Sequence, residues 1–168
     1  MLNKRGDCME KIDYLIDYLL KESGREELDY SNMDKKRLYR ALVNIRDAKP
    51  ISEDFLKEED EYLQDELHNR DVTNVDHIQT VKEKYKSSNL INSDKICLWQ
   101  GDITKLKIGA IVNAGNSQGL GCFIPNHNCI DNQINTYAGV RLRLACNEIM
   151  KNLNYNLETR KSNNNKRI

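Results

Sequence analysis

Residues 96–146 read ICLWQGDITKLKIGAIVNAGNSQGLGCFIPNHNCIDNQINTYAGVRLRLAC, and this stretch sets the fold class. It contains six of the eight glycines, four of the five cysteines and the only tryptophan of the 168-residue chain. The short apolar runs Ile96–Trp99 and Ile108–Ala114 predict strands, the second of them buried. A loop with three glycines, 115–121, follows, and apolar residues spaced by three and four then predict one long helix from about residue 131 to 153. Strand, strand, glycine loop and helix are typical of an α/β domain.

The residues before this stretch are highly charged and predict helices. Amphipathic stripes indicate one helix over 9–20, a second over 34–46 and a third over 52–70. Valines and an isoleucine spaced by three between residues 72 and 81 predict a short fourth helix, and the polar residues 82–94 predict a linker. We therefore expect a helical extension with its linker over 1–94, an α/β part over 95–153 and a polar tail over 154–168.

Several details of the helical part follow from local chemistry. Asp7 is expected to cap the first helix, and Ser31 or Asn32 the second, since short polar side chains accept a bond from the first helical turn. Ser52 opens the third helix. The acidic run Glu58–Glu61 is expected to be a solvated helix face, which is the usual place for such a run.

Composition excludes several function classes. Lys plus Arg and Asp plus Glu both number 26, and this balance argues against a general nucleic-acid binder, which would show a basic excess. No apolar run approaches the roughly 20 residues of a membrane span, and the N-terminus lacks the apolar core of a signal peptide. A cytoplasmic protein is therefore expected. Its five cysteines predict thiols or metal ligands rather than a disulfide framework.

Asp102 follows the first predicted strand directly. An acid at the carboxyl end of a strand points into the crevice where open α/β sheets bind ligands, and it can accept a hydrogen bond from an amine such as that of adenine. The alternative is that Asp102 caps the turn that follows it. From the residues alone, the cap is favoured.

Asn113 and Asn116 follow the second predicted strand. Asparagine offers both a donor and an acceptor, which suits ribose hydroxyls, and the neighbouring glycines allow backbone N–H groups to approach a phosphate. The alternative is a turn-rich loop without a ligand. Neither GxGxxG nor a Walker lysine is present.

Cys122, His127 and Cys129 form the third candidate feature. Two thiolates and an imidazole within eight residues suit a zinc ion, and three protein ligands with one open position are typical of catalytic zinc. The alternative is two small buried cysteines and a surface histidine, and spacing alone weighs both equally. Asp131 can orient a ligand histidine or accept a proton, but capping the next helix is its more common role.

These motifs resemble a known family. The sequence GDITKLKIGAIVNAGN, residues 101–116, is similar to the opening of macrodomains, which are α/β/α modules that bind ADP-ribose. The continuation GLGCFIPNHNCIDNQINTYAGVRLRLAC, residues 119–146, resembles the zinc-containing branch, the microbial protein-ADP-ribose hydrolases. The helical sequence over 37–66 also resembles the extension of that branch, so that the resemblance covers nearly the whole chain up to Met150.

The resemblance implies a reaction and a set of site residues. The reaction is hydrolysis of the bond between ADP-ribose and a modified protein side chain. Asp102 would contact the adenine, Asn116 would contact the ribose bonded to the modified side chain, and zinc (Zn2+) would lie beside that ribose. Zinc there can stabilise an oxyanion or activate water. The implied residues are Asn116 and Asp131 for catalysis, Asp102, Ile103, Asn113, Asn116 and Gly121 for substrate binding, and Cys122, His127 and Cys129 for the metal.

The resemblance also implies partners, namely an ADP-ribosylated lipoyl-carrier protein as substrate and a sirtuin-type ADP-ribosyltransferase as functional partner. Neither nucleic acid nor a membrane is implied. Two other functions stay open at this point. One is an ADP-ribose-binding module without turnover, and the other is a small zinc-binding interaction protein.

The sequence departs from the family pattern in three places. Gly115 stands where alanine is usual, and Asn135 stands where the branch usually has histidine, which puts turnover in question. The later strands and the second glycine loop of a macrodomain have no counterpart before Ile168. We therefore expect the first part of a macrodomain, a truncated fragment whose activity stays open.

Overall fold

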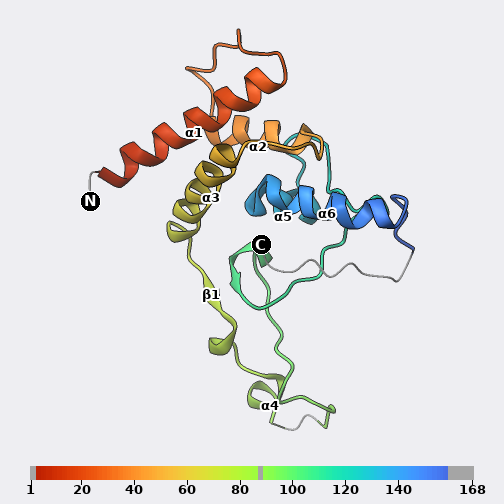
Figure 1. The fold of residues 1–168 in the computed structure, drawn as a ribbon. Helices are drawn as coiled ribbons and strands as arrows, with labels where there is room; N and C mark the ends of the chain where they lie inside the picture. The colour runs from red at the N-terminus through yellow and green to blue at the C-terminus, as the bar shows by residue number, and fades with distance from the viewer. Residues whose placement is uncertain (1–2, 87–88, 159–168) are drawn as a thin grey trace. The chain divides into compact units, whose positions relative to one another are not determined.

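The computed structural model describes residues 3–86 and 89–158. The chain forms two compact units, one from the residues up to Glu66 together with those from Asn113 onward, the other from Leu67–Val112. It is rich in helices and has a two-stranded parallel sheet, which is compatible with part of an α/β domain (Figure 1). None of the described helices is both long enough and apolar enough to cross a membrane. The predicted division at residues 94 and 153 stays a prediction.

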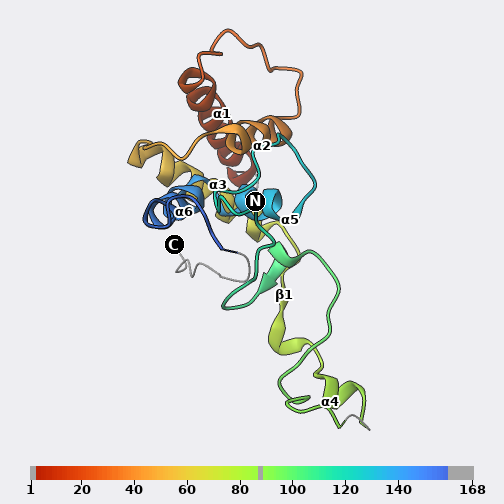
Figure 2. The ribbon, with the colours of Figure 1, turned by 90° about the vertical axis from the view of Figure 1, so that its right-hand side faces the viewer.

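The first unit is built from helices. In Figures 1 and 2, α2 lies between α1 on one side and α5 on the other. Burying an apolar side chain such as Phe55, which is fully enclosed, contributes about 1.5–3 kcal/mol. The helices are α1 (Asn3–Glu22), α2 (Lys35–Ile45), α3 (Glu53–His68), α5 (Ile130–Ala138) and α6 (Val140–Asn152). The core contains Ile12, Leu15, Ile16, Leu19, Leu20, Tyr39, Leu42, Val43, Phe55, Leu56, Tyr62 and Val140.

The first three helices confirm the predicted amphipathic stripes, but the first two differ from the predictions at their starts. Helix α2 is capped by Asp34, whose carboxylate accepts from the Arg37 N–H at 3.1 Å, so the expected cap at residue 31 or 32 is wrong. The reason is proximity, because Asp34 directly precedes the first helical residue. Asp7 does not cap α1 either, since that helix already begins at Asn3. Ser52 opens α3 as predicted, and its hydroxyl accepts from the Phe55 N–H at 3.2 Å.

The predicted long helix over 131–153 is wrong, because Gly139 breaks it into α5 and α6. Gly139 has a φ of 72°, which an ordinary helix cannot contain. A Cβ at this position would lie 2.6 Å from Oε2 of Glu59. The break therefore depends on glycine both for its backbone conformation and for the close approach of α3.

Glu59 corrects the expectation that the acidic run of α3 is entirely solvated. Its side chain is fully buried, where Oε1 accepts from the Tyr39 hydroxyl at 2.7 Å and Oε2 accepts from the Val140 N–H at 2.8 Å. Val140 is the first residue of α6, so Glu59 satisfies one of the open donors at the start of that helix from another element. Burial raises the pKa of Glu59 to about 7, although its two hydrogen bonds act in the opposite direction.

The second unit contains the sheet and three short helices. Its elements are β1 (Thr73–Asn74), η1 (Val75–His77), α4 (Val81–Lys84), η2 (Ile103–Lys105) and β2 (Leu106–Lys107). Strand β1 pairs parallel with β2, with Thr73 opposite Leu106. The predicted helix over 72–81 is wrong in its extent, because β1 occupies 73–74 and the helical part is the three-residue η1. A capping box formed by Thr80 and Glu83 begins α4 within what was predicted as a linker.

Both predicted strands are also wrong. Over Ile96–Trp99 the only described pairing is an isolated antiparallel bridge between Cys97 and Thr80. Over Ile108–Ala114 no strand is described, and Val112 is 90% exposed. Apolar runs of this kind become buried strands only where neighbouring strands pair with them and helices cover both faces. Among the described residues the sheet has two strands of two residues each, so that support is missing.

Candidate metal centre

Cys122, His127 and Cys129 come together in the first unit, as the sequence predicts. One ligand atom of each, the two sulfurs and a ring nitrogen, lie within 4.8 Å of one another, and Cys122 Sγ is 3.6 Å from His127 Nδ1. Zinc binds sulfur at about 2.3 Å and imidazole nitrogen at about 2.0–2.1 Å, so two ligands of one ion are at most about 4.6 Å apart. Small side-chain adjustments therefore suffice for all three to reach one ion.

The thiol of Cys129 has two roles in this arrangement. Its sulfur accepts from the Asn132 N–H at 3.4 Å and so caps α5, which corrects the expectation that Asp131 is the cap. Partial burial raises the pKa of this thiol, and the neighbouring Cys122 and Asp131 raise it further, whereas the Asn132 N–H lowers it. A nearby cation favours the thiolate, which is the form that binds metal.

Arg40 holds the backbone of the metal-ligand loop, residues 120–129, from the neighbouring helix α2. Its Nη2 donates to the backbone oxygen of His127 at 2.6 Å and to Oδ1 of Asn132 at 2.8 Å. Asn132 is fully buried, and its Nδ2 donates to the backbone oxygen of Ile124 at 2.9 Å. Arg40 and Asn132 together therefore fix the loop on either side of Pro125.

Asn44, also on α2, supports the same loop. Its Oδ1 accepts from the Asn126 N–H at 3.0 Å, and its Nδ2 donates to the Thr136 hydroxyl at 3.0 Å. Asn126 has a φ of 56°, a left-handed conformation that asparagine tolerates better than most residues. The buried amide of Asn44 thus connects the turn before His127 to α5.

Arg143, on α6, holds the start of the loop. Its Nε donates to the backbone oxygen of Leu120 at 2.8 Å, and its guanidinium lies 4.3 Å from the centre of the Phe123 ring. Its Nη1 donates to backbone oxygens at the end of α2, of Val43 at 2.9 Å and of Arg46 at 2.6 Å. Arg143 therefore satisfies open carbonyls of a helix end and anchors the loop with the same side chain.

Sequence inspection did not find Arg40, Asn44 or Arg143. Each contacts partners far along the chain, such as Asn132, which follows Arg40 by 92 residues. A local pattern carries no signal for such contacts. The one available clue is that Asn44 and Arg143 are polar residues within the buried stripe of a helix.

Asp131, Asn113 and Asn135 form a hydrogen-bonded group beside the metal ligands. Asp131 is 4% exposed, and its Oδ1 accepts from Asn113 Nδ2 at 2.7 Å and from Asn135 Nδ2 at 3.1 Å. Oδ1 of Asn135 is buried and has no hydrogen-bond partner among the described residues. The structure thus brings the predicted site residues Asn113 and Asp131 into contact, and Asn135 joins them through its hydrogen bond to Asp131.

Asn116 and Gly121 shape the loop that precedes the metal ligands. The Asn116 Oδ1 accepts from the Gln118 and Gly119 N–H groups at 3.0 and 3.2 Å, and its Nδ2 donates to the Gly121 oxygen at 3.3 Å. Gly121 has a φ of 86°, and a Cβ there would lie 2.6 Å from the Asn135 amide. Only glycine fits this close contact.

Asp102 and Ile103 lie in the second unit, apart in the chain from the other candidates. Asp102 caps η2 as the residues alone favour, and its Oδ1 accepts from the Thr104 N–H at 2.9 Å. Its Oδ2 accepts from Arg70 Nη2 at 2.8 Å. Partial burial raises the pKa of Asp102, but the hydrogen bonds from Thr104 and the charge of Arg70 outweigh it and hold the pKa below its usual value. The side chain is an ionised acceptor that is still 43% exposed.

Comparisons with known proteins find relatives of one kind. No protein-family profile matches the chain. A protein-ADP-ribose hydrolase of Staphylococcus aureus (strain Mu50 / ATCC 700699) is 42% identical over 144 residues, which cover 84% of this chain and 50% of the relative. One of Treponema medium is 39% identical over 145 residues, covering 84% of this chain and 53% of the relative. The chain spans about half the length of these relatives.

A third relative matches a shorter part of the chain. It is a probable bifunctional ADP-ribose hydrolase/ADP-ribosyltransferase of Fusarium oxysporum f. sp. cubense, 55% identical over 62 residues, which are 36% of this chain and 10% of the relative. Together these similarities confirm the resemblance to protein-ADP-ribose hydrolases that the sequence motifs predict.

Proposed function

We propose that this chain, related over most of its length to the protein-ADP-ribose hydrolases, carries the metal-binding part of a site that removes ADP-ribose from modified protein side chains. The observation that carries the proposal is the clustering of the Cys122, His127 and Cys129 ligand atoms within 4.8 Å. Glycosidic bond hydrolysis needs a water to be activated and a developing charge to be stabilised, and a metal with an open position can serve both needs.

Zinc is the metal that this ligand set favours. Two thiolates and one imidazole are soft and borderline ligands that zinc prefers over magnesium or calcium. When bound, zinc supplies a Lewis acid that polarises an oxygen and lowers the pKa of water. The chain itself supplies the rigid loop, because Arg40, Asn44 and Arg143 fix its backbone from two helices.

Asp131 is the proposed catalytic carboxylate. It is buried, lies in the first turn of α5, and is held in place by the amides of Asn113 and Asn135. A carboxylate in this position can accept a proton from the attacking water. The amides orient it, and through them Asn113 takes part in the site.

Asn116 is the proposed ribose contact and Gly121 its neighbour on the binding loop. The Asn116 side chain is exposed, and its bond to the Gly121 oxygen is long at 3.3 Å. Replacing this hydrogen bond by one to a ribose hydroxyl therefore requires little free energy. In the second unit, the exposed oxygens of Asp102 are proposed to accept the adenine amine, with Ile103 beside it.

The proposal is tested on the purified chain with stoichiometric zinc and an ADP-ribosylated carrier protein. Release of ADP-ribose is followed by chromatography, and Co2+ in place of zinc reports thiolate ligation by its absorption. Cys122→Ser is expected to lose the cobalt spectrum and at least about tenfold of the release rate, since a ligand of the metal is removed. Cys97→Ser, a matched thiol in the second unit, is expected to keep both.

Other outcomes identify the alternative functions. Calorimetric binding of ADP-ribose without release would indicate a binding module without turnover. Zinc binding with four protein ligands and no affinity for ADP-ribose would indicate a zinc-binding interaction protein, and would overturn the hydrolase proposal.

The proposed substrate is a lipoyl-carrier protein in the cytoplasm, and the proposed functional partner a sirtuin-type ADP-ribosyltransferase. The name of the Fusarium relative, which combines a hydrolase with an ADP-ribosyltransferase, supports a pairing of the two activities. Comparing release from a carrier protein with release from an unrelated ADP-ribosylated protein tests the substrate.

A further inference from the structure

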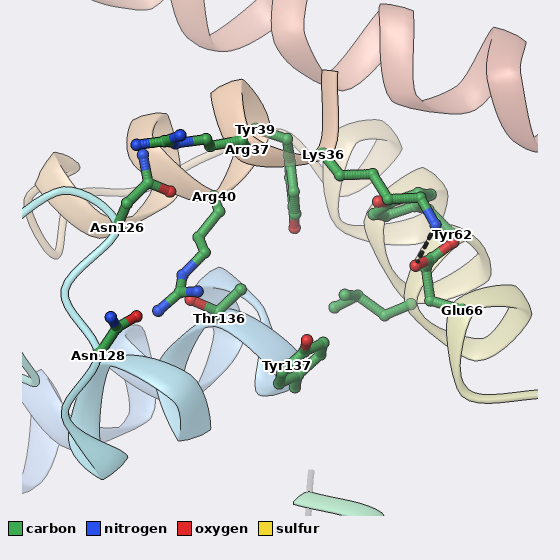
Figure 3. Close-up of a pocket in the computed structure, with 11 residues that line it drawn as sticks. Lys36, Arg37, Tyr39, Arg40, Tyr62, Glu66, Asn126, Asn128, Thr136 and Tyr137 are labelled. Atoms are coloured by element: carbon green, nitrogen blue, oxygen red, sulfur yellow. Dashed lines mark hydrogen bonds and ion pairs between the residues drawn. The ribbon is translucent and has the colours of Figure 1, made fainter. Parts of the chain in front are cut away.

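A cavity of about 450 Å³ lies in the first unit, between α2, α3, α5 and the loop that carries His127 (Figure 3). This volume is within the range of ligand-binding cavities. Three cationic side chains of α2 line it, those of Lys36, Arg37 and Arg40, together with the rings of Tyr39, Tyr62 and Tyr137. Asn126 and Asn128, on either side of His127, form another wall.

The charge of the cavity favours an anion. Of the residues that the structure describes, Glu66 is the only acid that lines it, and its carboxylate pairs with Lys36 at 2.8 Å, shown as a dashed line in Figure 3. Among the described residues, the Arg37 guanidinium has no ion-pair or hydrogen-bond partner. Arg40 bonds to uncharged oxygens of His127 and Asn132, so its charge is also not neutralised. Three cations thus face one carboxylate.

The arrangement of these cations favours an extended ligand over a small anion. In Figure 3 the guanidinium of Arg37 lies toward Asn126, whereas that of Arg40 lies toward Asn128 and Thr136. Because the guanidinium groups of Arg37 and Arg40 point to different residues along one wall, an extended ligand with several carboxylates can pair with more than one of them. Tyrosine and arginine are the residues enriched where proteins bind one another.

We propose that this cavity docks an acidic segment of a partner protein, with its carboxylates against the Lys36, Arg37 and Arg40 side of α2. This inference builds on the proposed function in one respect, that the partner is the ADP-ribosylated protein. Asn126 and Asn128 flank His127, so a segment bound here lies against the same loop that carries the metal ligands. Docking at this cavity presents the modified side chain to the neighbouring centre.

The test uses a fluorescein-labelled peptide of alternating glutamate and tyrosine and a matched peptide with glutamine in place of glutamate. Fluorescence anisotropy is measured with the full chain at low salt. The acidic peptide is expected to bind, and the amide peptide to bind much more weakly. Lys36→Ala and Arg37→Ala are each expected to weaken binding by about two- to fivefold, because each removes one largely exposed charge.

Arg25→Ala is the matched control, since Arg25 is exposed on the same unit but does not line the cavity. It is expected to bind the acidic peptide like the wild type. Equal binding of both peptides, or unchanged binding in the Lys36→Ala/Arg37→Ala double variant, would overturn the proposal. Displacement of the peptide by inorganic phosphate at matched ionic strength would indicate a small-anion site and overturn it as well.

The same preparations separate this inference from the proposed function. A chain that binds cobalt and releases ADP-ribose but does not bind the peptide contradicts the docking site alone. A chain that binds the acidic peptide through Lys36 and Arg37 but neither binds cobalt nor releases ADP-ribose contradicts the proposed function alone.

Discussion

At the scale of single residues, buried polar side chains connect the two sequence segments of the first unit. Arg40 and Asn44 reach the loop of the metal ligands, and Glu59 reaches the start of α6. Asn44 and Glu59 are buried, whereas Arg40 is half-buried. For the two buried residues, the loss of a partner would leave a desolvated polar group, which costs about 1–3 kcal/mol. These residues therefore have measurable consequences beyond their packing volume.

Arg40→Gln is expected to weaken zinc binding by about tenfold, because the residues behind metal ligands set their orientation and typically contribute 10–100-fold to affinity. The affinity is measured by competition with a chromogenic chelator. Arg37→Gln, one turn away on α2, is the control and is expected to keep the wild-type affinity, because among the described residues the Arg37 side chain has no hydrogen bond to the metal-ligand loop. Equal affinities of both variants would contradict a positioning role for Arg40.

Glu59→Gln is expected to remove part of the pH dependence of stability. The pKa of Glu59 is raised from 4.5 to about 7, so its contribution to stability is complete below pH 4.5 and is lost as the pH rises through 7. The full loss is on the order of 3 kcal/mol. The hydrogen bonds from the Tyr39 hydroxyl and the Val140 N–H and the charge of Arg46 lower the pKa of Glu59, whereas the charge of Asp60 raises it.

The measurement is urea unfolding of the Glu59→Gln variant and wild type between pH 4.5 and 8. As the pH rises through 7, the free energy of unfolding of the wild type is expected to fall relative to that of the variant. A difference that is constant over this range would show that Glu59 does not ionise there.

At the scale of elements, the first three helices could be predicted and the strands could not. A helix forms its hydrogen bonds within itself, so a stripe over 34–46 is enough to predict α2 within a residue or so. A strand needs partners elsewhere, and the apolar run over 108–114 has none among the described residues. The break at Gly139 escaped prediction because the stripe of apolar residues continues across it, and the side chain that lies against Gly139, Glu59, comes from the distant helix α3.

Gly139→Ala is expected to destabilise the first unit by about 1–3 kcal/mol, since an L-residue is strained at this φ and its Cβ meets Glu59. Thermal or urea unfolding measures the change. Gly24→Ala separates the two causes, because Gly24 has a similar φ of 66° with nothing within 4 Å of an added Cβ. Gly24→Ala is expected to lower the free energy of unfolding less than Gly139→Ala does. Equal losses would mean that the contact with Glu59 contributes nothing to the effect of Gly139→Ala.

At the scale of the whole molecule, spacing together with the family resemblance was needed to indicate the candidate metal ligands, and the side chains that support them could not be predicted at all. Cys122, His127 and Cys129 lie within eight residues of one another, so the sequence itself keeps them close. Their scaffold comes from α2 and α6, which only the folded chain brings to the loop. The comparisons identify relatives, while the arrangement of these contacts comes from the structure.

Zinc is expected to stabilise the folded chain, because the ligand atoms are gathered only in the folded state. At a free zinc concentration 100 times the dissociation constant, the gain is about 2.7 kcal/mol. Thermal unfolding with and without zinc measures it. Cys122→Ser is expected to lose the shift and Cys97→Ser to keep it, and a shift that persists in Cys122→Ser would place the zinc elsewhere.

The first unit closes around a long intervening segment, because its chain leaves at Glu66 and returns at Asn113. The entropy of closing such a loop grows only with the logarithm of its length, and doubling the length costs about 0.6 kcal/mol. The contacts of Arg40 and Arg143 are therefore nearly insensitive to how many residues lie between them. Insertions and deletions at the surface of the second unit can accumulate with little thermodynamic effect on the loop that carries the metal ligands.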